Sequence, residues 1–132
     1  IAQQSVCIVG PPGKRAKSFR FPQDLGDLPL LLPGPSSDIR SQFDLLCNEH
    51  EVEVDPYAEV DDMAMLRLLA RDSGGLAVVP EVVVQDELES GRLQRYYVLE
   101  DVVERFYAIT AKRHFEMVAL TTLLDKSRYS VD

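Results

Sequence analysis

Three short apolar runs of the sequence are each followed immediately by residues that could bind a ligand. After the first run, Gly34 lets the backbone approach a ligand, while Ser36 and Ser37 offer hydroxyl groups. If a helix starts there, its unpaired N–H groups add donors, and together they form a cradle for an anion or a carboxylate. The alternative is that one of the two serines simply caps the helix, which stabilises it by about 1 kcal/mol.

The turn after the second run is acidic, because it holds Glu59, Asp61 and Asp62. Carboxylates this close together could bind a hard cation through their oxygens or orient a cationic ligand. The alternative is that these acids only favour the start of a helix, where the helix dipole stabilises negative charge. The third run ends at Val79 and Pro80, which join the candidate ligand-binding residues because of their position.

Other kinds of chemistry find little support in the sequence. Neither His50 nor His114 has a second ligand at a spacing typical of zinc sites, so we expect no metal site. There is no Gly-x-Ser-x-Gly, Gly-x-Gly-x-x-Gly or Walker motif, and no base can be paired with a serine nucleophile at Ser36 or Ser37. We therefore expect neither a cofactor nor enzymatic activity.

The elements that must position these residues alternate between strands and helices. Strands are predicted at Val6–Val9, Leu30–Leu32, Val52–Ala58 and Leu76–Val79, and helices begin at Ser36 or Ser37, at Asp61 or Asp62, and at Pro80. A loop covers Lys14–Arg20, extended segments follow at Tyr96–Leu99 and Arg105–Ala111, and a last helix covers Glu116–Leu124. The pattern predicts an α/β fold with a mainly parallel sheet flanked by helices. Ligands bind such sheets beyond the carboxyl ends of the strands, where the candidate residues lie.

Composition sets limits on the partners of the chain. It has 132 residues and a net charge of -8, which opposes direct binding to nucleic acid or to an acidic membrane, although four cations gather in Lys14–Arg20. No apolar run approaches the length of a membrane span. The two cysteines, Cys7 and Cys47, suit structural thiols in a reducing cytoplasm. The chain begins abruptly at Ile1, in the approach to an expected strand, so we expect a fragment of a longer protein.

Several stretches of the chain resemble the effector-binding region of LysR-type transcriptional regulators. They are Ser5–Val9 with its proline-rich exit, Asp24–Leu25, Pro29–Pro33, Ser36–Arg40, Gly75–Pro80, Asp86–Leu93, and Phe106–Ile109 with Lys112 and Arg113. Within the family, the stretches Asp61–Leu66 and Ala70–Gly74 are similar to NhaR-type activators of a sodium/proton antiporter. The family resemblance covers most of residues 5–124.

The resemblance implies an effector domain of the type 2 periplasmic-binding-protein fold, present mostly as its second subdomain. Residues 21–100 would form that subdomain, while 1–20 and 101–132 would be the crossing strands, hinge and C-terminal helix. A hydroxyl at Ser36 or Ser37 would touch an effector in the cleft between the subdomains. DNA would be bound only through an N-terminal winged helix-turn-helix domain, in a homodimer or tetramer.

The implied effector is a small molecule or an ion. For an NhaR-type protein the signal would be sodium or lithium, and the acidic turn with Asp61 and Asp62 would then be the candidate site. Two other classes of protein compete with the regulator. A periplasmic solute-binding protein would have a secretory signal upstream of Ile1, and a small α/β enzyme would lose activity when Ser36 or His114 is replaced.

Overall fold

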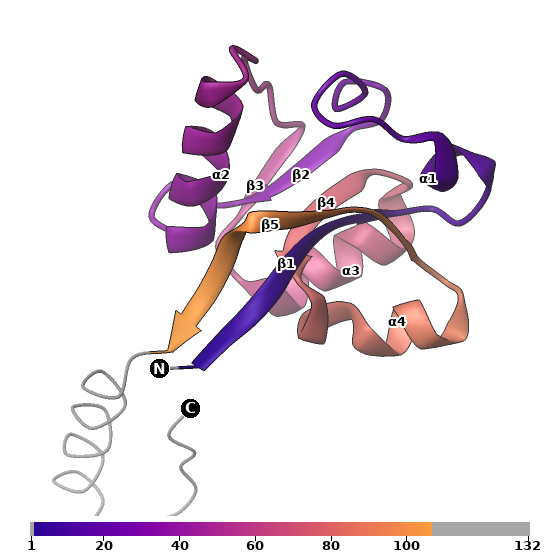
Figure 1. Ribbon diagram of the computed structural model, residues 1–132. Helices are drawn as coiled ribbons and strands as arrows, with labels where there is room; N and C mark the ends of the chain where they lie inside the picture. Colours follow the sequence, from indigo (N-terminus) through magenta and orange to yellow (C-terminus); the bar gives the residue numbers. More distant parts are fainter. Residues whose placement is uncertain (1, 107–132) are drawn as a thin grey trace, which may run out of the picture. The chain divides into compact units, whose positions relative to one another are not determined.

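A computed structural model describes residues 2–106 of the chain, and these residues form a mixed sheet with helices on both faces (Figure 1). The strands are β1 (Ala2–Gly10), β2 (Leu30–Pro33), β3 (Ala58–Val60), β4 (Leu76–Pro80) and β5 (Gln94–Phe106). The helices are α1 (Lys14–Ser18), α2 (Asp38–Glu49), α3 (Met63–Ser73), the short 3-10 helix η1 (Glu81–Val84) and α4 (Gln85–Ser90). The strand order is β3-β2-β4-β1-β5.

Strand direction follows from how each connection crosses the sheet. Strand β2 is parallel to both β3 and β4, with Pro33 opposite Val60 and Leu31 opposite Ala77. Strand β1 is antiparallel to β4, so that Val6 lies opposite Pro80. The connection from β1 to β2 stays at one end of the strands, so these two strands run in opposite directions. Helices α2 and α3 each carry the chain back along a face of the sheet before the next strand, which is then parallel. The prediction of a mainly parallel sheet is confirmed for β2, β3 and β4 and is corrected for β1, which runs antiparallel to β4.

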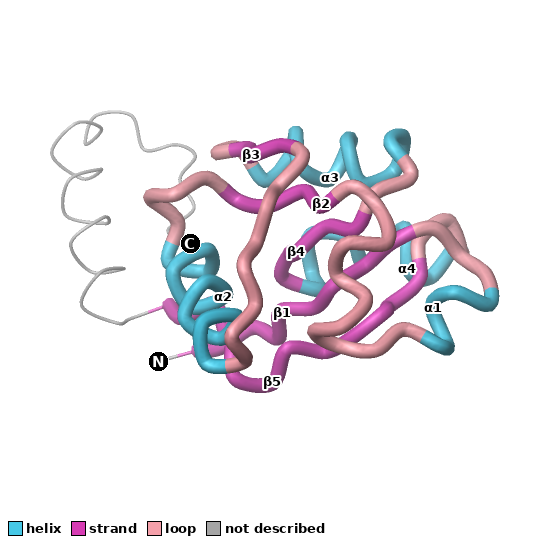
Figure 2. Tube along the Cα trace, turned by 90° about the horizontal axis from the view of Figure 1, so that it is seen from above, coloured by secondary structure: helices cyan, strands magenta, loops and turns pink. Residues whose placement is uncertain are grey.

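Side chains alternate between two apolar layers, one on each face of the sheet. On β4, Leu76 and Val78 pack toward α2, and Ala77 and Val79 pack toward α3. Figure 2 shows α2 and α3 on opposite sides of the strands. All five residues of β4 are buried, as a strand covered on both faces requires.

Two of the predicted helix starts are confirmed, and in each pair of candidates the second residue is the cap. The hydroxyl of Ser37 accepts a hydrogen bond from the backbone N–H of Arg40 at 3.3 Å. The carboxylate of Asp62 accepts one from Ala64 at 2.9 Å and caps α3. Gly74 ends α3 with a φ of 77°, a left-handed conformation that favours glycine. No helix in residues 2–106 is long and apolar enough to span a bilayer.

The structure corrects three predicted elements. The predicted loop Lys14–Arg20 contains α1. The helix predicted from Pro80 begins one residue later, because Pro80 ends β4 and caps η1, which leads directly into α4. The predicted strand Val52–Ala58 pairs only from Ala58 onward. Val52 and Val54 pack on the apolar layer beneath α2, so their alternation with exposed acids reflects packing without strand pairing.

The end of the chain is described only in part. The extended segment predicted at Tyr96–Leu99 belongs to β5, which continues to Phe106 and so includes the start of the predicted Arg105–Ala111 segment. The rest of that segment, His114 and the predicted helix Glu116–Leu124 lie outside the described residues. The chain divides into two compact units, and Gln4–Glu104 forms the one discussed below. The subdomain boundaries near residues 20 and 100 stay a prediction.

Both cysteines are buried free thiols. Cys7 belongs to the layer beneath α3, and Cys47 belongs to the layer beneath α2. Burial, followed by the nearby charge of Glu81, raises the pKa of Cys7 to about 12, although Arg95 acts in the opposite direction. Burial and the charge of Asp44 raise the pKa of Cys47 to about 11. At neutral pH both groups are therefore protonated.

This burial predicts a loss of stability at alkaline pH. Between pH 9 and about 11 the cysteines of the unfolded chain release their protons while those of the folded chain keep them. The unfolded state then binds fewer protons, so the free energy of unfolding falls as pH rises. Urea unfolding at pH 8 and pH 10 should show a steeper loss for the wild type than for the Cys7→Ala/Cys47→Ala double variant. Equal losses in the two proteins would contradict the prediction.

Candidate functional site

The turns that follow β2 and β3 meet at one edge of the sheet. Because the two strands are parallel and Pro33 lies opposite Val60, both chains leave the sheet side by side. The N–H of Gly34 donates to the carbonyl of Val60 at 3.1 Å. A Cβ atom on Gly34 would lie only 1.8 Å from Oδ1 of Asp61, so glycine leaves the room that this carboxylate occupies. The structure thus brings the Gly34 turn and the acidic turn together, as the sequence predicted.

The two serines have different surroundings. Ser37 is half-buried and its oxygen caps α2, as the alternative to a ligand role states. A hydroxyl that accepts a hydrogen bond still has its own O–H to donate, so capping does not prevent Ser37 from meeting an anion. Ser36 precedes it in the same turn and is exposed. The first turn of α2 therefore presents one exposed hydroxyl and one that is already oriented by the helix.

The three carboxylates of the acidic turn have separate neighbours. Glu59 pairs with Arg40, Asp62 caps α3, and Asp61 lies against Gly34. Within residues 2–106 no group of three or more histidine, cysteine, aspartate or glutamate side chains is arranged to hold a metal ion. Of the three acids, Asp61 is the one whose carboxylate lies directly at the Gly34 turn.

Val79 and Pro80 are not open to a ligand through their side chains. Both are buried, and Val79 is part of the apolar layer beneath α3. They end β4 at the same edge as Pro33, because β2 and β4 are parallel. They place the backbone that leads into η1, and their part in effector binding stays a prediction.

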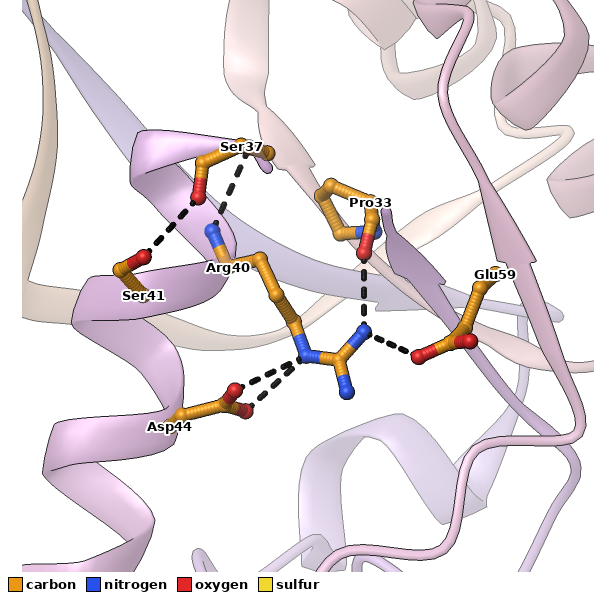
Figure 3. A network of polar contacts seen from close by, with 6 residues as sticks. All are labelled: Pro33, Ser37, Arg40, Ser41, Asp44 and Glu59. Atoms are coloured by element: carbon orange, nitrogen blue, oxygen red, sulfur yellow. Dashed lines mark hydrogen bonds and ion pairs between the residues drawn. The ribbon is translucent and has the colours of Figure 1, made fainter. Parts of the chain in front are cut away.

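The sequence analysis did not single out Arg40, whose side chain connects α2 to β2 and β3 (Figure 3). Its Nη1 donates to the carbonyl of Pro33 at 3.1 Å and to Oε2 of Glu59 at 2.7 Å. Its Nε donates to both carboxylate oxygens of Asp44, at 3.0 and 3.1 Å. One side chain therefore joins α2, the end of β2 and β3. We call Arg40, Asp44, Glu59 and the Pro33 carbonyl the Arg40 network.

Burial and ion pairing act in opposite directions on Arg40, whose side chain is 12% exposed. Burial works against its charge, but the hydrogen bonds to Glu59 and Asp44 outweigh this and raise the pKa of Arg40. The i to i+4 spacing of Arg40 and Asp44 on a helix is a signal that could have been read from the sequence. The partner 19 residues away, Glu59, could not have been found in that way.

The remaining candidates from the sequence have structural roles. In the basic segment, Arg20 pairs with Asp24 at 3.3 Å, and Arg15 lies 4.0 Å from Asp27. The ring of His50 packs edge-on against Phe21, with 5.6 Å between ring centroids. The acids thus neutralise part of the basic segment, and His50 packs at the end of α2.

Comparison with known proteins identifies the family. The family model of the LysR substrate binding domain matches residues 1–129. The chain belongs to this family. Its fold is accordingly the type 2 periplasmic-binding-like α/β fold predicted from the sequence. No curated protein matches the chain.

Several solved structures resemble this LysR substrate-binding domain. The full-length HypT of Salmonella typhimurium, a hypochlorite-specific LysR-type regulator, gives a TM-score of 0.60 at 18% identity, over 94% of this chain and 46% of that one. The effector-binding domain of QuiR with shikimate gives 0.60 at 16% identity, over 74% and 46%. Vibrio fischeri DarR in complex with DNA gives 0.56 at 20% identity, over 74% and 34%. This chain spans about half or less of these structures.

Proposed function

We propose that this LysR substrate-binding domain is the effector-sensing part of a cytoplasmic transcriptional regulator. One observation carries the proposal: three parallel strands end at one edge, where the turns of Gly34 and Asp61 meet beside the start of α2. In an open parallel sheet this is the edge at which ligands bind. Membership of the LysR family supports a regulatory role for that edge.

In this proposal the edge is one wall of a cleft between two subdomains. Residues 21–100 make the second subdomain, and the crossing segments 1–20 and 101–132 lead to the first. The hydroxyls of Ser36 and Ser37 donate to an anionic group of the effector, and the unpaired N–H groups of α2 add to the attraction. The complex of QuiR with shikimate, a carboxylate, supports a small organic effector in this fold.

The effector would control transcription through the equilibrium between two arrangements of the subdomains. A ligand that binds one arrangement more tightly shifts the population toward it by its difference in binding free energy. DNA would be contacted by an N-terminal helix-turn-helix domain of a homodimer or tetramer. The DNA complex of DarR supports this assignment of DNA binding to the complete protein.

We further propose a narrower identity, that of an NhaR-type activator of a sodium/proton antiporter gene. The stretches Asp61–Leu66 and Ala70–Gly74 support it by resemblance. The signal would then be sodium or lithium, with the Asp61 carboxylate as a first oxygen ligand at the edge. Since the acids of this turn have separate neighbours, further oxygens would have to come from the opposite wall of the cleft.

A titration of the full-length regulator tests the site. Small carboxylates, beginning with shikimate, and sodium and lithium chloride are titrated while binding is followed by calorimetry. We expect the Ser36→Ala/Ser37→Gly double variant to bind the carboxylate at least tenfold more weakly, since a hydrogen bond to a charged group contributes about 1.5–3 kcal/mol. Glycine has no side-chain donor, and at a helix N-cap it costs only a few tenths of a kcal/mol, so α2 stays folded.

Two controls make the result specific. Ser41 is exposed on the same helix and its hydroxyl donates to the carbonyl of Ser37, so Ser41→Ala should leave affinity unchanged. Asp61→Asn should abolish a response to alkali cations and leave carboxylate binding intact. Unchanged carboxylate affinity in the double serine variant would refute the anion site, and an unchanged alkali response in Asp61→Asn would refute the cation site.

A further inference from the structure

A second hollow lies beside α4 and shares no residue with the candidate site. Its volume is about 280 Å³, just below the range of about 300–1,000 Å³ for ligand pockets and suited to a ligand smaller than a drug. It is lined by charged, amide and apolar side chains, namely Gln4, Glu81, Val82, Gln85, Leu88, Glu89 and Arg95. We call it the α4 hollow. Four elements build it: β1, η1, α4 and β5.

The walls of the α4 hollow combine both signs of charge. The Nε of Arg95 contacts Oε2 of Glu81, so this ion pair joins β5 to η1. The Nε2 of Gln85 donates to Oε2 of Glu89 at 3.3 Å, which orients the second carboxylate along α4. Val82 and Leu88 supply the apolar part. One guanidinium and two carboxylates leave an excess of one negative charge.

Arg95 and Glu81 can each give up their contact with one another and bind a charged group of a ligand instead. The side chains of Arg95 and Glu81 are 50% and 32% exposed, and ion pairs this open to water contribute little to stability. Bringing a ligand carboxylate to Arg95 therefore costs little. The other partner, Glu81, would then be ready to accept from a ligand ammonium group, and Glu89 lies in the same lining.

The helix that carries Gln85 and Glu89 is firmly held. Glu87 on the same helix is 4% exposed, and its Oε2 accepts from the Nε of Arg67 on α3 at 2.9 Å. The backbone carbonyl of Glu87 also accepts from the N–H of Leu93 at 3.1 Å. These contacts hold α4, and with it the backbone of Gln85 and Glu89, in place before any ligand arrives, which lowers the entropic cost of binding.

We propose that the α4 hollow binds a free α-amino acid. The ligand carboxylate meets the guanidinium of Arg95, the ammonium group meets the carboxylates of Glu81 and Glu89, and an aliphatic side chain packs on Val82 and Leu88. A simple anion is repelled by the excess negative charge, and a simple amine leaves Arg95 without a new partner. The amide groups of Gln4 and Gln85 can serve either end of a zwitterion.

Calorimetric titration of the 132-residue chain with leucine and lysine tests this site. Acetate and isobutylamine are titrated in parallel, because each carries only one of the two charged groups. We expect both amino acids to bind at least tenfold more tightly than acetate or isobutylamine, and Arg95→Gln to weaken amino-acid binding at least tenfold. Glu89→Gln should weaken it less, because Glu81 keeps one carboxylate in the hollow.

Arg92→Gln is the matched control, since Arg92 is exposed, lies three residues away and pairs only weakly with Asp72 at 3.5 Å. It should bind amino acids like the wild type, and thermal unfolding without ligand should show all variants folded. The proposal fails if neither amino acid binds at millimolar concentration, if isobutylamine binds as well as leucine, or if Arg92→Gln loses as much affinity as Arg95→Gln. Ser37→Gly should not affect this binding, so failure here and failure at the effector edge are distinguishable.

Discussion

Phe43→Ala should lower the free energy of unfolding by about 3–5 kcal/mol. Phe43 is 0% exposed and is among the largest side chains that are fully buried in residues 4–102. It lies in the middle of α2 and packs in the layer with Ile39, Leu46 and the β-strand residues beneath. Removing its ring leaves a cavity that the rigid strands cannot fill. Urea unfolding at 25 °C followed by circular dichroism measures the effect.

Leu45→Ala is the control on the same helix. Leu45 is 63% exposed, so its truncation should change the free energy of unfolding by less than about 0.5 kcal/mol. Similar losses in the two variants would show that α2 does not pack through the face assigned to it. The comparison also bears on function, because α2 positions both Ser37 and Arg40. A variant with a loosened α2 should therefore lose effector binding even where it remains folded.

The parts of the fold that could be predicted are those determined by neighbouring residues. The uniformly apolar Leu76–Val79 run predicted a strand buried on both faces, and the structure confirms it. The capping residues Ser37 and Asp62 could be narrowed to pairs of candidates because a cap acts within three residues of itself. The meeting of the Gly34 and Asp61 turns followed from the parallel direction of their strands.

The parts that could not be predicted depend on contacts between distant residues. Val52 and Val54 alternate with acids as a strand would, yet they pack on the core without pairing, and only the tertiary structure decides between the two. The same holds for the link between Arg40 and Glu59, which joins a helix to a strand 19 residues later. The α4 hollow is likewise lined by residues that are scattered along the sequence from Gln4 to Arg95, so no local sequence pattern predicts it.

Arg40→Ala should lower the free energy of unfolding by about 2 kcal/mol. Its partners Asp44 and Glu59 are 46% and 41% exposed, so water screens their ion pairs and most of the loss comes from elsewhere. The carbonyl of Pro33, a buried residue, loses the guanidinium that donates to it. The packing of the aliphatic part of the Arg40 side chain is lost as well. Arg40→Lys should recover only part of this, since an ammonium group cannot reach all three partners in the same geometry.

Urea unfolding of these variants at low and high salt separates the contributions. The difference between wild type and Arg40→Ala should shrink only modestly in 1 M salt, because salt screens the exposed carboxylates but does not replace the hydrogen bond to Pro33. Arg92→Ala, which breaks an exposed pair with Asp72, should change stability by less than about 0.5 kcal/mol. A loss in Arg40→Ala as small as that of Arg92→Ala would mean that the Arg40 network does not hold the edge together.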